Sequence, residues 1–140
     1  MDSLGRRNST LLLSTMWGDD ITEAFEQAAL GMLAYITDLR CVEPIKTQQI
    51  EAEGHDLESL LYHFLDEFLF LFSAEPFFIA KNVKILKFDK ENFRITAEGV
   101  GEIFDLSRHP QGTEVKAITY SNMQIFDSIN KHECYVIVDI

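Results

Sequence analysis

The chain ends in two anionic groups that could hold a metal ion. Asp139 and the free carboxylate of Ile140 follow the apolar run YVIV, which is typical of a β-strand and would keep both groups in place. Ca²⁺ and Mg²⁺ prefer oxygen ligands of this kind. Because most terminal aspartates are simply hydrated, the pair predicts a cation site only if a further carboxylate comes from elsewhere in the chain.

A single lysine in the run EVKAIT is the second residue that could do chemistry. If the run is a strand, its two-residue period places Lys116 on one face with Glu114 and Ile118. The pattern alone favours a surface lysine paired with an acid across the sheet. The functional reading is a point positive charge that contacts a phosphate or a carboxylate of a partner.

Sequence signatures of enzymes are absent from the chain. The four histidines show no HExxH or paired spacing, and there is no GxSxG, P-loop or GxGxxG motif. His63 lies three and four residues from Asp66 and Glu67, which a solvated helix face explains better than a metal site does. We therefore expect a protein that is not an independent enzyme.

Composition limits the class of protein and of partner. The 140 residues include 46% hydrophobic residues and eleven phenylalanines, which predicts one folded domain. The formal net charge of −11 argues against extensive binding to nucleic acid, which depends on Lys and Arg. No apolar run is long enough for a membrane span, and the short run after Arg6 and Arg7 is too short for a signal peptide. We expect a soluble protein of the cytoplasm or nucleus.

The two cysteines support the same location. Cys41 and Cys134 lie far apart without CxxC spacing, so they indicate neither a zinc site nor a disulfide scaffold. We expect both to be reduced, buried thiols.

Two amphipathic helices must support any site. Residues 21–36 carry one apolar stripe, and Asp20 followed by Glu23 has the form of a capping box. A second helix begins at Asp56, buries leucines and phenylalanines on one side, and ends around Ser73 before a proline.

In the rest of the chain, apolar and polar residues alternate over short runs, as in β-strands, and turn signals separate these runs. Several connections are too short for a crossover helix, so antiparallel pairing is expected. The fold class is therefore α+β, with two helices covering one face of a largely antiparallel or mixed sheet. The predicted strands cover residues 47–53, 83–88, 93–98, 100–106, 114–120, 123–126 and 135–140.

Several long motifs, in order, carry a resemblance to a known family. The chain resembles archease, the small partner protein of RtcB-type tRNA-splicing ligases, from about residue 17 to residue 140. The motifs are WGD at 17–19, EAFEQAALGM in the first helix, DLESLLYHFLDEFLF at 56–70, HPQGTEVKAITY at 109–120 and IVDI at 137–140.

The resemblance implies a function and a site. Archease-like proteins are non-catalytic cofactors that promote guanylylation of the ligase's active-site histidine and let it turn over repeatedly. In the family a divalent cation, seen as calcium, is bound by an aspartate of an HTAD motif, the C-terminal aspartate and the last carboxylate. By this likeness Asp139 and Ile140 are metal ligands, and Lys116 is the functional lysine.

The chain departs from the family at its N-terminus. Counting back from Trp17, the HTAD aspartate position falls on Leu11, within Asn8-Ser9-Thr10-Leu11. We accordingly separate a divergent segment, residues 1–16, from one archease-like domain, residues 17–140. Losing one of three protein anions predicts weakened binding of Ca²⁺ or Mg²⁺. Asp19 or Asp20 could substitute, although both have the positions of turn and cap residues.

Other functions remain open at this point. One alternative is a chaperone-like or calcium-dependent module that binds diverse proteins, consistent with the acidic surface and with exposure of Phe77 and Phe78. An independent hydrolase has no supporting motif.

Overall fold

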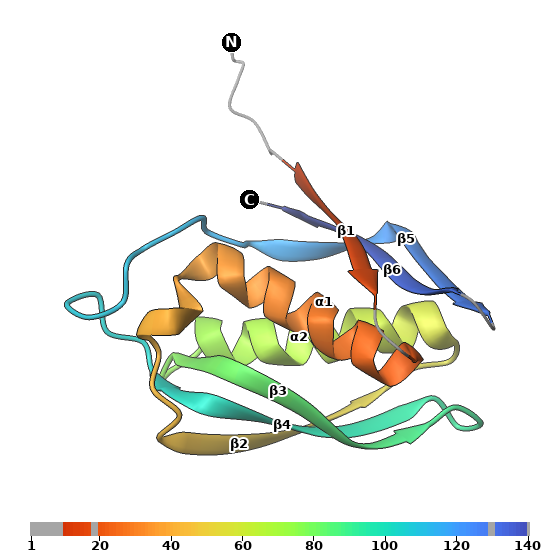
Figure 1. Cartoon of the computed structure of the whole chain (residues 1–140), viewed down its shortest axis with the longest axis horizontal. Helices are drawn as coiled ribbons and strands as arrows, with labels where there is room; N and C mark the ends of the chain where they lie inside the picture. Colours follow the sequence, from red (N-terminus) through yellow and green to blue (C-terminus); the bar gives the residue numbers. More distant parts are fainter. Residues whose placement is uncertain (1–9, 18–19, 129–130, 140) are drawn as a thin grey trace, which may run out of the picture.

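Two helices lie between two three-stranded antiparallel sheets (Figure 1). The computed structural model describes residues 10–17, 20–128 and 131–139. One sheet has the order β1-β6-β5, from strands Thr10–Trp17, Lys131–Asp139 and Ala117–Ser128. The other has the order β2-β4-β3, from strands Lys46–Glu53, Arg94–Ile103 and Phe78–Asp89. The helices are α1 (Ile21–Ile36) and α2 (Leu57–Ser73), and a short 3₁₀ helix, η1 (Leu39–Cys41), follows α1.

The α+β class is confirmed, but the strands form two sheets rather than one. Both helices contact strands of both sheets, so each helix needs apolar side chains toward two layers. The fully buried members of the resulting core include Phe25, Met32, Leu33, Leu60, Leu61, Phe64, Leu65 and Phe68.

Both helices begin where the sequence predicts, each after an aspartate N-cap, and the capping box is found at Asp56 and Ser59. The Asp20 carboxylate accepts a hydrogen bond from the Glu23 N–H at 2.8 Å. The Asp56 carboxylate accepts one from the Ser59 N–H at 2.7 Å, and the Ser59 hydroxyl accepts the Asp56 N–H in return. These bonds satisfy first-turn amides that have no partner within the helix.

Two pairs of predicted strands are single strands. Residues 93–98 and 100–106 contribute to β4, because Gly99 and Gly101 allow close packing instead of a turn. A Cβ at Gly101 would lie 1.9 Å from the Ile79 carbonyl oxygen, and one at Gly99 would lie 2.9 Å from the Phe68 ring. Similarly, β5 continues through an irregularity in its register between Thr119 and Gln124.

The N-terminal strand crosses the boundary that the sequence suggests between residues 16 and 17. Strand β1 pairs antiparallel with β6, with Thr10 opposite Asp139 and Leu11 opposite Val138. Residues 10–16 are therefore part of a sheet.

Two surface features complete the description. Cys134 is buried as expected, whereas Cys41 is exposed, because it ends the short helix η1 at the surface. Of the helices within the described residues, none has the length and apolar character needed to cross a membrane.

Candidate functional site

Three strands reach the same edge of the β1-β6-β5 sheet at the C-terminal end of β6. Asp139 lies opposite Thr10 of β1 on one side and opposite Ala117 of β5 on the other. The backbone therefore brings together Leu11, Lys116 and Asp139, which are far apart in sequence. We refer to residues 10–11, 116–117 and 139 as the strand-end edge (Figure 1).

Lys116 lies immediately before β5 and is exposed, together with Glu114. Its neighbours Val115 and Ile118 are buried. The prediction that Lys116 shares a face with Ile118 is wrong, because regular strand pairing begins only at Ala117. The buried residues on both sides instead fix the backbone and leave the ammonium group in solvent.

The connection that carries Lys116, residues 104–116, is anchored at its first half by His109. This side chain is fully buried, and its Nδ1 accepts a hydrogen bond from the Asp105 N–H at 2.8 Å. Since Nδ1 is an acceptor, the ring proton of neutral His109 lies on Nε2, which is 2.9 Å from the Glu102 carboxylate. His109 therefore bridges the loop backbone and strand β4.

The Glu102 carboxylate is the centre of this arrangement. It is 3% exposed. It also accepts hydrogen bonds from the Arg108 guanidinium and, at 2.8 Å, from the Glu43 N–H. The hydrogen bonds from Arg108, with those from Glu43 and His109, lower the pKa of Glu102 to about 2. Glu102 is thus a buried anion whose remaining cost of desolvation is offset by three donors. Neither Glu102 nor His109 was a site candidate from the sequence.

The second half of the connection is fixed to the C-terminal end of α1. The Thr37 hydroxyl donates to the Pro110 carbonyl at 2.6 Å, and the N–H groups of Gly112 and Thr113 donate to carbonyls of the last helical turn at 2.8 and 2.7 Å. A Cβ at Gly112 would lie 2.5 Å from the Tyr35 carbonyl oxygen. Residues 109–112 therefore lie against the C-terminal end of α1, and a hydrogen-bonded turn precedes them, between Asp105 and His109.

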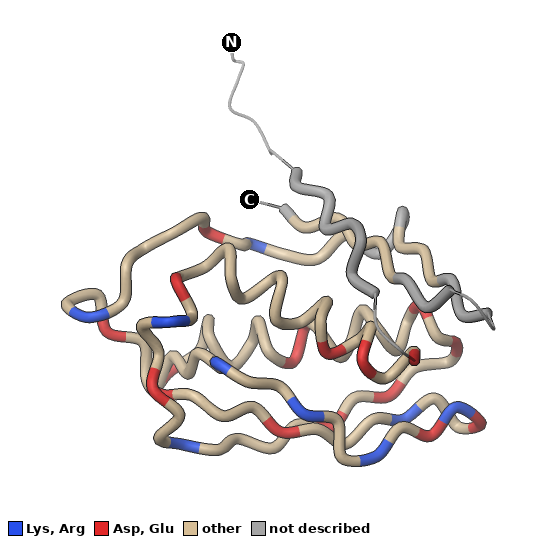
Figure 2. Tube along the Cα trace, viewed as in Figure 1, with Lys and Arg blue, Asp and Glu red and all other residues tan. Residues whose placement is uncertain are grey.

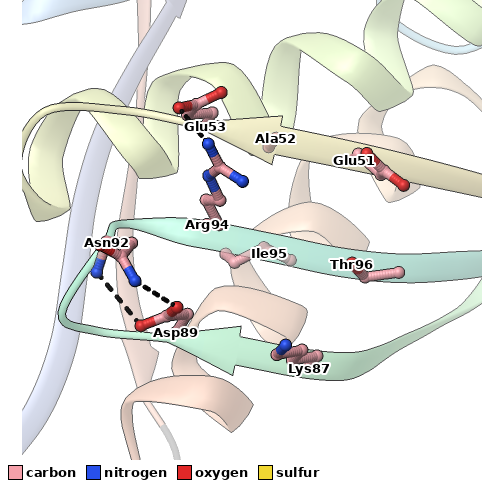
Figure 3. Close-up of a pocket in the computed structure, with 9 residues that line it drawn as sticks. All are labelled: Glu51, Ala52, Glu53, Lys87, Asp89, Asn92, Arg94, Ile95 and Thr96. Atoms are coloured by element: carbon pink, nitrogen blue, oxygen red, sulfur yellow. Dashed lines mark hydrogen bonds and ion pairs between the residues drawn. The ribbon is translucent and has the colours of Figure 1, made fainter.

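A polar hollow of about 520 Å³ lies on the other sheet, where the β3-β4 hairpin ends (Figure 3). Two of its carboxylates contact a partner within the lining. Arg94 is 3.2 Å from Glu53, and the Asp89 carboxylate receives the N–H and side-chain amide of Asn92. The first contact joins β4 to β2, and the second lies within the turn of the β3-β4 hairpin.

Comparison with known proteins identifies the family. A model of the Archease protein family (MTH1598/TM1083) matches residues 12–140. The chain belongs to the archease family. Protein archease of Ictalurus punctatus is 58% identical over 124 residues, which cover 89% of this chain and 76% of the relative. Protein archease-like of Drosophila melanogaster is 55% identical over 126 residues, covering 89% and 81%.

A solved structure has the same fold. The solution structure of Methanobacterium thermoautotrophicum protein 1598 matches with a TM-score of 0.74 and 31% identity, over 95% of this chain and 92% of the other. Archease membership supports, in general terms, a non-catalytic cofactor role associated with a tRNA ligase.

The archease metal site can be tested only in part. The Asp139 side chain and all of Ile140 lie outside the part of the chain that the structure describes. Among the described residues, no three His, Cys, Asp or Glu side chains gather closely enough to hold a metal ion. The register does place the Leu11 backbone beside the end of β6, and a leucine side chain carries no oxygen. Weakened cation binding therefore stays a prediction.

Proposed function

We propose that this protein is a non-catalytic cofactor of an RtcB-type tRNA-splicing ligase. In this role it promotes guanylylation of the ligase's active-site histidine and permits multiple turnovers in tRNA splicing. The observation that carries the proposal is the strand-end edge of an archease-family chain, where Lys116 precedes the residue that pairs with Asp139.

Lys116 is the residue that we assign to activation. It is exposed at the end of an anchored connection, so it can reach a partner without unfolding the sheet. A lysine ammonium is a compact point charge that suits a phosphate or a carboxylate. In our proposal it contacts the ligase or its nucleotide while guanylylation takes place.

Overall charge supports a protein partner that is basic. The chain carries a formal net charge of −11, and Figure 2 shows acidic positions along both helices as well as on the β2-β4-β3 sheet. An RNA ligase needs a basic surface for its substrate, and complementary charge accelerates the encounter of two proteins. We therefore place the contact with the protein of the splicing complex rather than with RNA.

The proposal includes a divalent cation that this chain binds weakly. We assign Asp139 and the Ile140 carboxylate as ligands for a divalent cation, Ca²⁺ or Mg²⁺, with the position of the family's third ligand taken by Leu11. Removing one of three protein anions reduces both the attraction for the ion and the rigidity of the site.

The proposal is tested by measuring ligase guanylylation with GTP and Mg²⁺, with and without the purified protein. We expect a faster single-round rate and several rounds of RNA joining per ligase molecule. A folded protein that leaves both quantities unchanged would show that this chain does not act as a ligase cofactor.

A second candidate function is a module that binds diverse proteins. One observation favours it: Ile45, Phe77 and Leu106 are exposed around a shared hollow. Another weakens it, since Phe78, which was expected to be exposed, is 2% exposed and belongs to the core. Suppression of aggregation of an unrelated, heat-denatured enzyme would support this candidate, whereas stimulation confined to the RNA ligase would exclude it.

A further inference from the structure

The connection of residues 104–116 leads from one sheet to the other and determines where Lys116 lies. It leaves β4 of the β2-β4-β3 sheet, passes the C-terminal end of α1, and enters β5 of the β1-β6-β5 sheet (Figure 1). A connection of this length has many conformations when free, so its ends alone do not fix a residue near one of them. The position of Lys116 depends on the anchors in between.

His109 is the anchor that joins the connection to the β2-β4-β3 sheet. Its ring receives the Asp105 N–H at 2.8 Å on one nitrogen and lies 2.9 Å from Glu102 with the other. Its ring centroid is 5.5 Å from that of Phe104, which in turn packs against Phe72 of α2 at 5.2 Å. Packing against Phe104 therefore fixes the plane of the ring, and the two hydrogen bonds fix the directions in which its nitrogen atoms point.

Further contacts hold the backbone between His109 and Lys116. The next residue, Pro110, accepts the Thr37 hydroxyl, and Gly112 and Thr113 bind the last carbonyls of α1. Val115 is buried directly before Lys116. From His109 to Val115 the backbone is held by hydrogen bonds to α1 or by burial at several successive points.

Stability alone does not explain a buried polar pair at this place. Replacing a buried ionic or polar pair by well-packed apolar side chains is often neutral or stabilising. An apolar side chain could fill the space of the imidazole, but it could not bind the Asp105 N–H and the Glu102 carboxylate together. What the imidazole adds is a defined geometry for the loop.

We infer that His109 is a positioning residue, which through its bonds to Asp105 and Glu102 holds the connection so that Lys116 lies at the strand-end edge. The inference rests on the proposed function for its consequence in activation. Its structural part, the holding of the connection, is independent of any ligase.

The decisive variant is H109F, which keeps a buried ring and removes both hydrogen bonds. In H109F we expect faster amide hydrogen exchange at residues 112–117 and unchanged exchange in β2. The melting temperature should fall, because the buried Glu102 carboxylate and the Asp105 N–H each lose a partner, so exchange is measured well below it. Unchanged exchange at residues 112–117 would overturn the inference, whatever the ligase assay shows.

The consequence for activation is measured as the rate of ligase guanylylation at a saturating concentration of this protein. We expect the maximal stimulated rate of guanylylation to fall about ten- to a hundredfold in H109F, because displacing a functional group by about 1 Å has effects of this size. The protein concentration for half-maximal stimulation should change much less. Normal stimulation by a folded H109F would refute the positioning role.

Two conservative variants provide the matched controls. In H109N the amide oxygen can replace Nδ1, and in H109Q the amide nitrogen can replace Nε2, so each can restore one of the two bonds. We expect both to stimulate better than H109F, and equal loss in all three would contradict the assigned bonds. If the unmodified protein itself gives no stimulation, the proposed function fails, and hydrogen exchange alone decides whether His109 holds the connection.

Discussion

Ala117 lies directly opposite Asp139 in the antiparallel register of β5 and β6. Thr10 of β1 lies opposite the same aspartate on the other side. Because β6 is the central strand, one backbone position fixes the relative placement of three segments from the beginning, the last third and the end of the chain. Any function at this edge depends on all three strands being in register.

Replacing Lys116 by alanine should abolish stimulation of ligase guanylylation while the fold remains intact. The side chain is exposed, so the free energy of unfolding should change by no more than about 0.5 kcal/mol. The measurements are the stimulated rate and a urea unfolding curve. K84A, which removes an exposed lysine of the other sheet, is the matched control and should stimulate normally. Unchanged stimulation by K116A would remove Lys116 from the site.

Restoring the family's N-terminal ligand should strengthen cation binding. In the variant N8H/S9T/T10A/L11D a third carboxylate is added beside the end of β6, which gives a hard cation one more anionic oxygen ligand. We expect the dissociation constant for Ca²⁺, measured by titration calorimetry, to fall at least about tenfold. L12D adds the same charge one residue further along the chain and should have a much smaller effect. Equally tight binding by the unmodified protein would contradict the predicted weakness.

Stability at acid pH should depend on Glu102. Its pKa is about 2 in the folded protein, below the ordinary value of 4.5, so the folded state favours the ionised form. The stabilisation is fully present above about pH 4.5 and is lost progressively as the pH falls toward 2. In E102Q the free energy of unfolding should therefore decrease less steeply over this range. Urea unfolding at several pH values measures the slope, and an unchanged slope would show that Glu102 is not the titrating group.

The partly exposed Asp38 provides a comparison for this experiment. Its pKa is also lowered to about 2, by hydrogen bonds from Arg40, but the pair lies in solvent. Water and salt screen exposed pairs. D38N should therefore reduce the acid-pH dependence of the free energy of unfolding less than E102Q does. At neutral pH, E102Q should cost about 1–3 kcal/mol, because the buried His109 loses a charged acceptor.

Gly112 should not tolerate a side chain. A Cβ at this position would lie 2.5 Å from the Tyr35 carbonyl oxygen, and 3.0 Å from that of Ile36, so G112A must push the connection away from α1. We expect a loss of about 1–3 kcal/mol, seen as a lower melting temperature. Q111A changes an exposed neighbour and should have little effect. Equal melting temperatures of the two variants would mean that the connection does not need this contact.

Local patterns predicted the helices well because their determinants lie within a few residues. The caps at Asp20 and Asp56 and the apolar stripes are local features, and the structure contains both helices at the expected places. The arrangement of strands in two sheets was not predictable in this way. It depends on which strands pair, and the first described strand pairs with the last.

The buried pair of Glu102 and His109 shows why part of the site was missed. In β4 the inward residues alternate at positions 95, 97, 99 and 101, so the strand period predicts that Glu102 faces solvent. It is buried because the loop that follows β4 folds back over it and supplies Arg108 and His109. Similarly, the family resemblance singled out Lys116 and Asp139 as functional residues, and the sequence by itself could not supply the register that brings their backbones together.

The pairing of β1 with β6 has a consequence for synthesis on the ribosome. Of the described strands, β1 emerges first but has no strand partner until β6, some 115 residues later, has been made, and β5 waits for the same strand. During translation the helices can pack on the β2-β4-β3 sheet while two strands expose unpaired edges, a state prone to aggregation. Late strand insertion of this kind would make the nascent chain a client for general chaperones before it becomes a cofactor itself.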